Sequence, residues 1–243
     1  MFLPFGFNDP LYMMVMLVGL VLVFVPQMWV KSTIGKFSEI RTSRGVAGRD
    51  VARAILSEHG LSNVSVEMVD GFLSDHYDPL SKTVRLSPDI YQGNSIASVA
   101  VAAHECGHAI QHAKGYFPVV IRSAMVPAVN FGSSLGPLLL MLSLGLGFTS
   151  HVMPAWAWYT AWIGVALYGA AVAFHFVTLP VELDASGRAL KVLESRYFLN
   201  ADEMSGAKKV LTAAAFTYIA TAMYALIQLL YYVFRLMASR RED

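Results

Sequence analysis

Residues 11–30 read LYMMVMLVGLVLVFVPQMWV, a stretch without a single charged side chain. A helix needs about 20 apolar residues to cross the hydrocarbon core of a bilayer, and this stretch just reaches that length. It is unlike a secretory signal, because no basic residue precedes it and no small-residue cleavage site follows it. We therefore expect a retained N-terminal membrane anchor over residues 1–30.

Three further apolar blocks follow along the chain. Residues 119–148 and 155–179, joined by a tight connection at residues 149–154, predict a transmembrane helical hairpin. Tryptophans open the second of these two blocks, as they do at membrane–water interfaces. The last block, residues 210–236, would make a helix about 40 Å long, which exceeds the ~30 Å hydrocarbon core. We expect its first part to pack on the non-membrane part of the chain.

Composition agrees with a polytopic membrane protein. Only 14% of the residues are charged and 56% are apolar, whereas soluble domains carry about 25% charged residues. The lipid bilayer is therefore an expected partner. The net charge of +1 gives no electrostatic reason to expect nucleic-acid binding. The single cysteine, Cys106, excludes a disulfide framework and a cysteine-based zinc site, so any metal ligands must be nitrogen or oxygen atoms.

Basic residues predict the orientation of the chain in the membrane. They are absent before the first span and frequent directly after it, at Lys31, Lys36, Arg41, Arg44, Arg49 and Arg53. The positive-inside rule places residues 31–118 in the cytoplasm, with the protein in the plasma membrane. Residues 180–209 return to the same side after two crossings. Residues 210–243 comprise the long hydrophobic helix and a basic tail. Arg235, Arg240 and Arg241 do not fit a fourth full crossing, so either the last helix crosses incompletely or the rule fails there.

The non-membrane part reads as a small α+β unit. Helical spacing of apolar residues predicts a helix over residues 45–56, and alternation predicts a strand over residues 64–68. Residues 75–79 have turn chemistry, and residues 83–86 would form the returning strand. Asn94 or Ser95 then caps a helix that reaches about His112.

This last helix contains the most informative motif, His104-Glu105-Cys106-Gly107-His108, an H-E-x-x-H arrangement. Residues four apart lie on one helix face, so both imidazoles can hold one Zn²⁺ ion. Glu105 lies about 100° round the helix, where it can reach a water on the metal. Zinc lowers the pKa of such a water to about 7, and a carboxylate can accept its proton. The alternative, a buried cluster without metal, would be costly for three titratable groups.

A catalytic zinc site needs a third protein ligand. His112 lies on the same helix face, but ligands spread over two turns span about 12 Å, too far for one ion. Glu182 is the better candidate, because two predicted spans separate it from the motif and return it to the same side. We expect Pro180 to end the third apolar block and Glu182 to begin a new helix. Asp184 could accept a hydrogen bond from a ligating histidine.

These stretches resemble the YugP-type membrane zinc metallopeptidases, and the resemblance extends along the whole chain. The motifs that carry it are His104-Glu105-Cys106-Gly107-His108-Ala109-Ile110-Gln111 and Val181-Glu182-Leu183-Asp184-Ala185-Ser186, with weaker support from Asp75-His76-Tyr77-Asp78-Pro79 and Val84-Arg85-Leu86-Ser87-Pro88. The chain is more distantly similar to gluzincins such as the HtpX-type and Ste24-type membrane proteases. The resemblance implies zinc on His104, His108 and Glu182, with Glu105 as catalytic base. Ser186 departs from those distant relatives, which have aspartate there.

The expected fold class is thus a mostly α, polytopic membrane protein with a small α+β zincin-like catalytic part. That part would comprise residues 31–118, and residues 180–209 would supply the third ligand. His76 and Tyr77 could stabilise a tetrahedral oxyanion, or could belong to a hairpin turn. We also expect the edge of the strand that ends near Ser87 to pair with an extended protein or peptide substrate.

Two other functions compete with a zinc metallopeptidase. One is a site-2-type intramembrane protease, in which Asp184 would be the third ligand and the H-E-x-x-H helix would itself span the membrane. Residues 95–114 are too polar for exposure to lipid, although other helices could shelter them. The other is a membrane chaperone or adaptor that binds zinc without turnover. Glu105 argues against it, since a purely structural site needs no general base.

Overall fold

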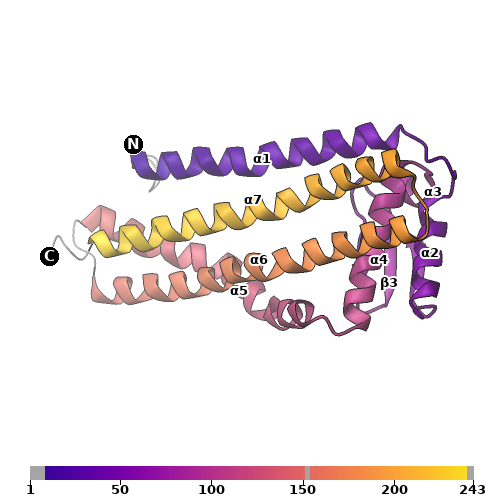
Figure 1. Cartoon of the computed structure of the whole chain (residues 1–243). Helices are drawn as coiled ribbons and strands as arrows, with labels where there is room; N and C mark the ends of the chain where they lie inside the picture. The colour runs from indigo at the N-terminus through magenta and orange to yellow at the C-terminus, as the bar shows by residue number, and fades with distance from the viewer. Residues whose placement is uncertain (1–8, 151–153, 240–243) are drawn as a thin grey trace. The chain divides into compact units, whose positions relative to one another are not determined.

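The computed structural model describes residues 9–150 and 154–239, and most of them are helical. The helices are α1 (Pro10–Ser38), α2 (Gly48–Glu58), α3 (Pro88–Gln92), α4 (Ile96–Ala113), α5 (Phe117–Ser150), α6 (Ala155–Ser195) and α7 (Ala201–Ser239). The strands are β1 (Ser65–Met68), β2 (His76–Asp78) and β3 (Thr83–Leu86). A mostly α fold with a small sheet is therefore confirmed, and Figure 1 shows its long helices.

All four predicted apolar blocks are helical. The helices Pro10–Ser38, Phe117–Gly145, Ala155–Ser195 and Ala201–Ala238 are long and apolar enough to cross a membrane. The side chains of Met14, Leu17 and Val21 on α1 are largely exposed, as lipid-facing residues are. Part of the predicted connection at residues 149–154, namely residues 151–153, lies outside the described residues.

The chain divides into two compact units. Residues Met1–Val25, Ile121–Thr178 and Tyr218–Asp243 form the first, and Pro26–Val120 with Leu179–Thr217 forms the second. The four long helices each contribute to both units. All the predicted metal-site residues fall in the second unit, which also contains the sheet and the helices α2, α3 and α4.

The second unit is built around α4. The apolar face of α2, with Val51 and Ile55, is buried in one core with the alanines of α4. The start of α7 joins the same core through Val210 and Leu211, which confirms that the first part of the last apolar block packs on the non-membrane part. Ser95 caps α4, since its side chain accepts a hydrogen bond from the backbone N–H of Ser98.

The sheet differs from the predicted hairpin. Its strand order is β1-β3-β2, in which β3 pairs parallel with β1 and antiparallel with β2. The predicted turn at residues 75–79 was wrong, because β2 occupies residues 76–78. The turn lies later, where the Asp78 carboxylate accepts hydrogen bonds from the backbone N–H groups of Leu80 and Ser81.

This topology also corrects the expected substrate edge. Both edges of β3 are occupied by neighbouring strands over Thr83–Leu86, so β3 has no free edge for a substrate segment. Among the described strands, β1 and β2 are the outer ones. A peptide that adds to this sheet would therefore have to pair with one of them.

The prediction that Pro180 ends a helix was wrong. Helix α6 continues through Pro180 from Ala155 to Ser195. An internal proline costs about 3 kcal/mol because it removes one hydrogen bond and crowds the preceding turn. Val181 and Ala185, just beyond it, are fully buried, and this packing offsets the local cost.

Candidate metal centre

Three predicted ligands converge on one point between α4 and α6. His104 and His108 lie one turn apart on α4, and their ring centres are 4.7 Å apart. Glu182 lies on α6 with its side chain only 4% exposed. The ligating atoms of all three residues lie within 4.8 Å of one another. In Figure 1 the C-terminal end of α6 crosses α4.

Gly107 sets the close approach of the two helices. A Cβ atom at this position would lie 2.6 Å from the backbone oxygen of Ala185. No residue larger than glycine fits there without moving backbone. Because Gly107 directly precedes His108, and Ala185 lies three residues after Glu182, this contact brings the two ligand-bearing segments together.

The spacing of the ligand atoms fits a zinc ion. Nε2 of His104 and Nε2 of His108 lie 3.4 and 3.5 Å from Oε2 of Glu182. Two donors that are each ~2.1 Å from a tetrahedral zinc ion lie about 3.4 Å apart. Two histidines and one carboxylate are also a ligand set used by catalytic zinc sites. These three residues thus have the chemistry and the spacing to hold one Zn²⁺.

Comparison with known proteins agrees with this geometry. Residues 12–237 match the family model described as "putative neutral zinc metallopeptidase". The chain belongs to this zinc metallopeptidase family. It is 41% identical over 233 residues to the "putative membrane protease YugP" of Bacillus subtilis, and the alignment covers 96% of the chain and 100% of that relative. No solved structure shows a significant match. Family membership implies that the metal is zinc.

Each of the two histidines has a hydrogen-bonding partner at Nδ1, the ring nitrogen that does not face Glu182. Oγ of Ser186 lies 3.1 Å from Nδ1 of His104, and Oε1 of Gln111 lies 3.1 Å from Nδ1 of His108. Both partners fix the ring orientation. The amide oxygen of Gln111 can only accept, so it keeps a proton on Nδ1 of His108 and leaves Nε2 free to ligate, whereas the Ser186 hydroxyl can donate to or accept from His104. Ser186 therefore takes up a contact behind the histidine despite its departure from the aspartate of distant relatives.

Gln111 connects the site to Asp184. It is fully buried, and its amide nitrogen donates to the backbone oxygen of Val181 and to the Asp184 carboxylate, both at 2.7 Å. These two acceptors leave the amide oxygen to face His108. Asp184 therefore reaches the histidine through Gln111. Gln111 was not among the predicted site residues, although its position at the end of the motif of residues 104–111 was a signal.

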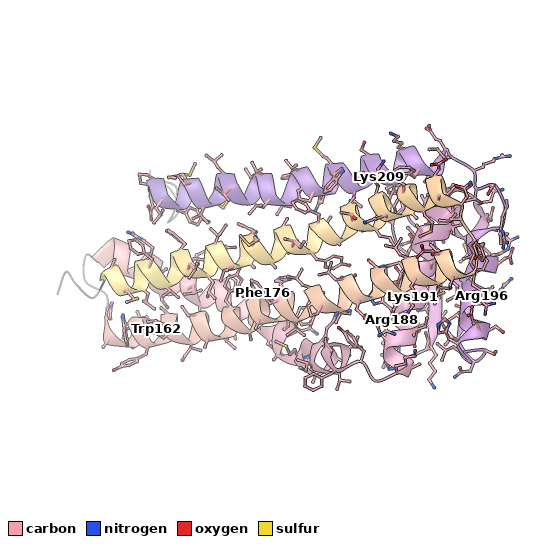
Figure 2. The ribbon with its side chains drawn as sticks, viewed as in Figure 1. Trp162, Phe176, Arg188, Lys191, Arg196 and Lys209 are labelled. Atoms are coloured by element: carbon pink, nitrogen blue, oxygen red, sulfur yellow. The ribbon has the colours of Figure 1, made fainter. Side chains whose placement is uncertain are left out.

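Asp184 is engaged elsewhere as well. Its carboxylate accepts a hydrogen bond of 2.6 Å from Nε of Arg188, one turn further along α6. Arg188 in turn stacks over the ring of Tyr116, 5.7 Å from the ring centre. Figure 2 marks Arg188 on α6. Arg188 and Gln111 both donate to Oδ2 of Asp184, and Asp184 is not among the three residues whose ligand atoms converge.

Glu105 is buried beside the ligands. Burial raises its pKa, since a charged carboxylate is poorly solvated there, while His104 and His108 act in the opposite direction. The nearby carboxylates of Glu182 and Asp75 raise its pKa further. A carboxyl group with a raised pKa is a better proton acceptor and donor near neutral pH than an exposed glutamate.

His108 is subject to opposed effects. Burial by itself would lower its pKa, but the hydrogen bond to Glu182 and the charge of Glu105 outweigh burial and raise it. The carboxylates around the histidines thus favour positive charge at this point. A bound divalent cation would meet the same favourable field.

Asp75 is a second acidic group near the site, although its sequence context predicted only a turn residue. Its carboxylate accepts hydrogen bonds from the backbone N–H and the hydroxyl of Ser87. Burial raises its pKa, and the Ser87 bonds partly oppose this shift. It therefore ties the start of β2 to the end of β3 and places a carboxyl group near Glu105.

His76 and Tyr77 occupy different surroundings. Nδ1 of the exposed His76 lies 2.7 Å from the backbone oxygen of Ser74. The Tyr77 hydroxyl lies 3.2 Å from Nδ1 of His112, in the last turn of α4. Burial raises the pKa of Tyr77, and the charge of Asp78 adds to this, so the phenol stays a hydrogen-bond donor. Successive strand residues point to opposite faces, and Tyr77 is the one that faces α4.

Proposed function

We propose that this protein is a membrane-embedded zinc metallopeptidase that hydrolyses peptide bonds in protein or peptide substrates. The observation that carries the proposal is the convergence of His104, His108 and Glu182, whose ligand atoms lie within 4.8 Å of one another, with both histidines 3.4–3.5 Å from Glu182. Membership of a zinc metallopeptidase family supports it. The family match does not depend on the distances between these atoms, so the two observations are independent.

The roles of the residues follow from their positions. A zinc ion held by His104, His108 and Glu182 supplies a Lewis acid and lowers the pKa of a water in the open coordination position to about 7. Glu105 does not ligate. It accepts a proton as the scissile carbonyl is attacked and passes this proton to the leaving amine, which is general base followed by general acid catalysis.

Stabilisation of the oxyanion is assigned to the β2 region. Tyr77 is better placed than His76, because its hydroxyl contacts α4 one turn beyond His108. A protonated phenol can donate a hydrogen bond to the developing negative charge. The catalytic role of His76 stays a prediction. Tyr77→Phe should lower kcat while KM changes little, and His76→Ala tests the competing assignment in the same assay.

The central experiment combines zinc content with cleavage. Glu105→Gln should retain one zinc per chain and lose activity by at least a hundredfold, the usual scale of general-base catalysis. His104→Ala and Glu182→Gln should lose both zinc and activity. Substrates are found by comparing membrane proteomes of cells that express the intact protein or the Glu105→Gln variant. Equal fragment patterns in the two would contradict a peptidase function.

The same measurements separate the two competing functions. A site-2-type protease with Asp184 as ligand predicts zinc loss in Asp184→Asn and retention in Glu182→Gln, whereas we expect the reverse. The contacts of Asp184 with Arg188 and Gln111 support our assignment. A zinc-binding chaperone or adaptor predicts that every cellular phenotype survives Glu105→Gln.

We further propose that the active site faces the cytoplasm at the plasma membrane. The basic residues that follow the first span support this orientation. Leu80 is 95% exposed, and the native Cys106 is buried with a raised thiol pKa, so a Leu80→Cys variant offers one reactive thiol. A membrane-impermeant maleimide should label it only after cell lysis. Labelling in intact cells would reverse the orientation.

A further inference from the structure

A groove of about 550 Å³ lies between the end of α1 and the start of α7, both within the second unit. Three lysines, Lys36, Lys208 and Lys209, line it together with four hydroxyl side chains and the rings of Trp29 and Phe37. No metal-site residue contributes to it. The groove is therefore separate from the proposed catalytic centre.

The spacing of its residues shows that two helix faces make the groove. On α7 the lining residues are Ser205, Lys208, Lys209 and Thr212, which are three, four and seven positions apart. On α1 the residues from Trp29 to Phe37 repeat with the same spacing. Such positions lie on one face of a helix. The helices meet at the base, where a Cβ on Gly206 would lie 2.8 Å from the ring of Phe37.

The groove has an uncompensated positive charge. Its lining contains no acidic side chain. Among the described residues, no carboxylate forms an ion pair with Lys36, Lys208 or Lys209, whereas Arg196, for example, is paired with Glu58. Three ammonium groups and several hydroxyl donors around one hollow form a site for an anion with several oxygen atoms.

The position of the groove along both helices is the second observation. On α1 it overlaps the end of the uncharged stretch of residues 11–30, and on α7 it overlaps the start of the apolar block of residues 210–236. Trp29 packs edge-on against Phe216, with ring centres 5.4 Å apart, and tryptophan favours the headgroup level of a bilayer. Figure 2 marks Lys209 at this part of α7. The lysines therefore lie where lipid phosphates would be.

We infer that this groove binds the headgroup of an anionic phospholipid, with its phosphate oxygens on Lys36, Lys208 and Lys209. Basic pockets between membrane helices commonly hold such headgroups. The aromatic wall formed by Trp29 and Phe37 has no role for a free phosphate ion, but it can cover the glycerol and the first carbons of an acyl chain. The site would fix the depth and tilt of α1 and α7 in the membrane.

The test uses the purified full-length protein in detergent, with lipid binding measured by native mass spectrometry. Phosphatidylglycerol, phosphatidylcholine and inorganic phosphate are titrated in separate arms. The test variant is Lys36→Gln/Lys208→Gln/Lys209→Gln. The control variant removes the same charge from exposed lysines outside the groove, Lys31→Gln/Lys114→Gln/Lys191→Gln. Zinc content and the thermal unfolding midpoint report whether each variant remains folded.

We expect selective phosphatidylglycerol binding by the wild type, weakened on the order of a hundredfold in the test variant, at about fivefold for each lysine. The control variant should bind within about fivefold of the wild type. Equal losses in both variants would show a general charge effect and would overturn the site. Equal wild-type affinity for phosphatidylcholine, or displacement of the lipid by millimolar phosphate, would also overturn it, and neither of these measurements depends on a variant.

Discussion

Replacement of Gly107 by alanine tests how the metal centre is assembled. Its added Cβ would lie 2.6 Å from the backbone oxygen of Ala185, whereas ordinary contact begins at 3.4 Å, so α4 and α6 would have to separate by about 0.8 Å (3.4 minus 2.6). Zinc–ligand distances tolerate only about ±0.2 Å. The histidines and Glu182 would then no longer reach one ion together without strain.

The expected magnitudes follow from two opposed effects. Overpacking in a close-packed interior costs typically 1–3 kcal/mol, while alanine improves helix propensity by about 1 kcal/mol relative to glycine. The free energy of unfolding should therefore fall by about 0–2 kcal/mol, and the protein should stay folded. Zinc affinity should fall about tenfold to a hundredfold, as it does when the shell around a metal site is disturbed.

The assay compares zinc dissociation constants and thermal unfolding midpoints of purified variants. Gly187→Ala is the matched control, because Gly187 lies inside α6 near the site but no atom lies within 4 Å of its added Cβ. It should bind zinc normally and be about as stable as the wild type or up to about 1 kcal/mol more stable. Wild-type zinc affinity in Gly107→Ala would refute the view that this contact sets the ligand geometry.

Three further predictions concern the groups around the ligands. Ser186→Ala removes the partner of His104 Nδ1, so zinc affinity measured by competition with a chelator should fall about tenfold, and Ser186→Thr should restore most of it. Gln111→Leu removes the side-chain partner of the Val181 backbone oxygen and of His108 Nδ1, whereas Asp184 keeps its bond to Arg188, so the free energy of unfolding should fall by about 1–3 kcal/mol in denaturant titrations. Burial raises the pKa of Asp75 above its ordinary value of 3.8. The folded state therefore holds the Asp75 proton more tightly than the unfolded state does, and the stability of the protein falls as pH rises from 3.8 through the folded pKa. Asp75→Asn, which can still accept from the Ser87 N–H, should remove that loss when unfolding midpoints are compared across pH, and an unchanged pH dependence would contradict it.

The local features of the sequence predicted the helices and the chemistry of the site. An uncharged apolar run of about 20 residues has few alternatives to a membrane helix. Two histidines four residues apart must share a face once the segment is helical. Ser95 as the cap of α4 follows from the same local rules. Each of these inferences depends only on residues that are close in the chain.

The two wrong predictions, the turn at residues 75–79 and the helix end at Pro180, have a common cause in tertiary packing. Turn chemistry at residues 75–79 and the helix-breaking character of Pro180 were outweighed by pairing of β2 with β3 and by burial of Val181 and Ala185. Local propensities are worth about 1 kcal/mol per residue for most side chains and about 3 kcal/mol for proline, and tertiary packing can exceed either. The sequence therefore could not fix the strand order or the length of α6.

By itself, then, the sequence determined a helix with two possible zinc ligands on one face and four helices apolar enough to cross a membrane, because periodicity and side-chain chemistry are properties of neighbouring residues. Only the tertiary structure decided which carboxylate lies beside the two histidines and which side chains contact their Nδ1 atoms. Glu182 and Ser186 reach the site, and Gln111 bonds to Asp184, because Gly107 lets α4 and α6 touch backbone to backbone. Such contacts join residues more than seventy positions apart, and no local pattern encodes them.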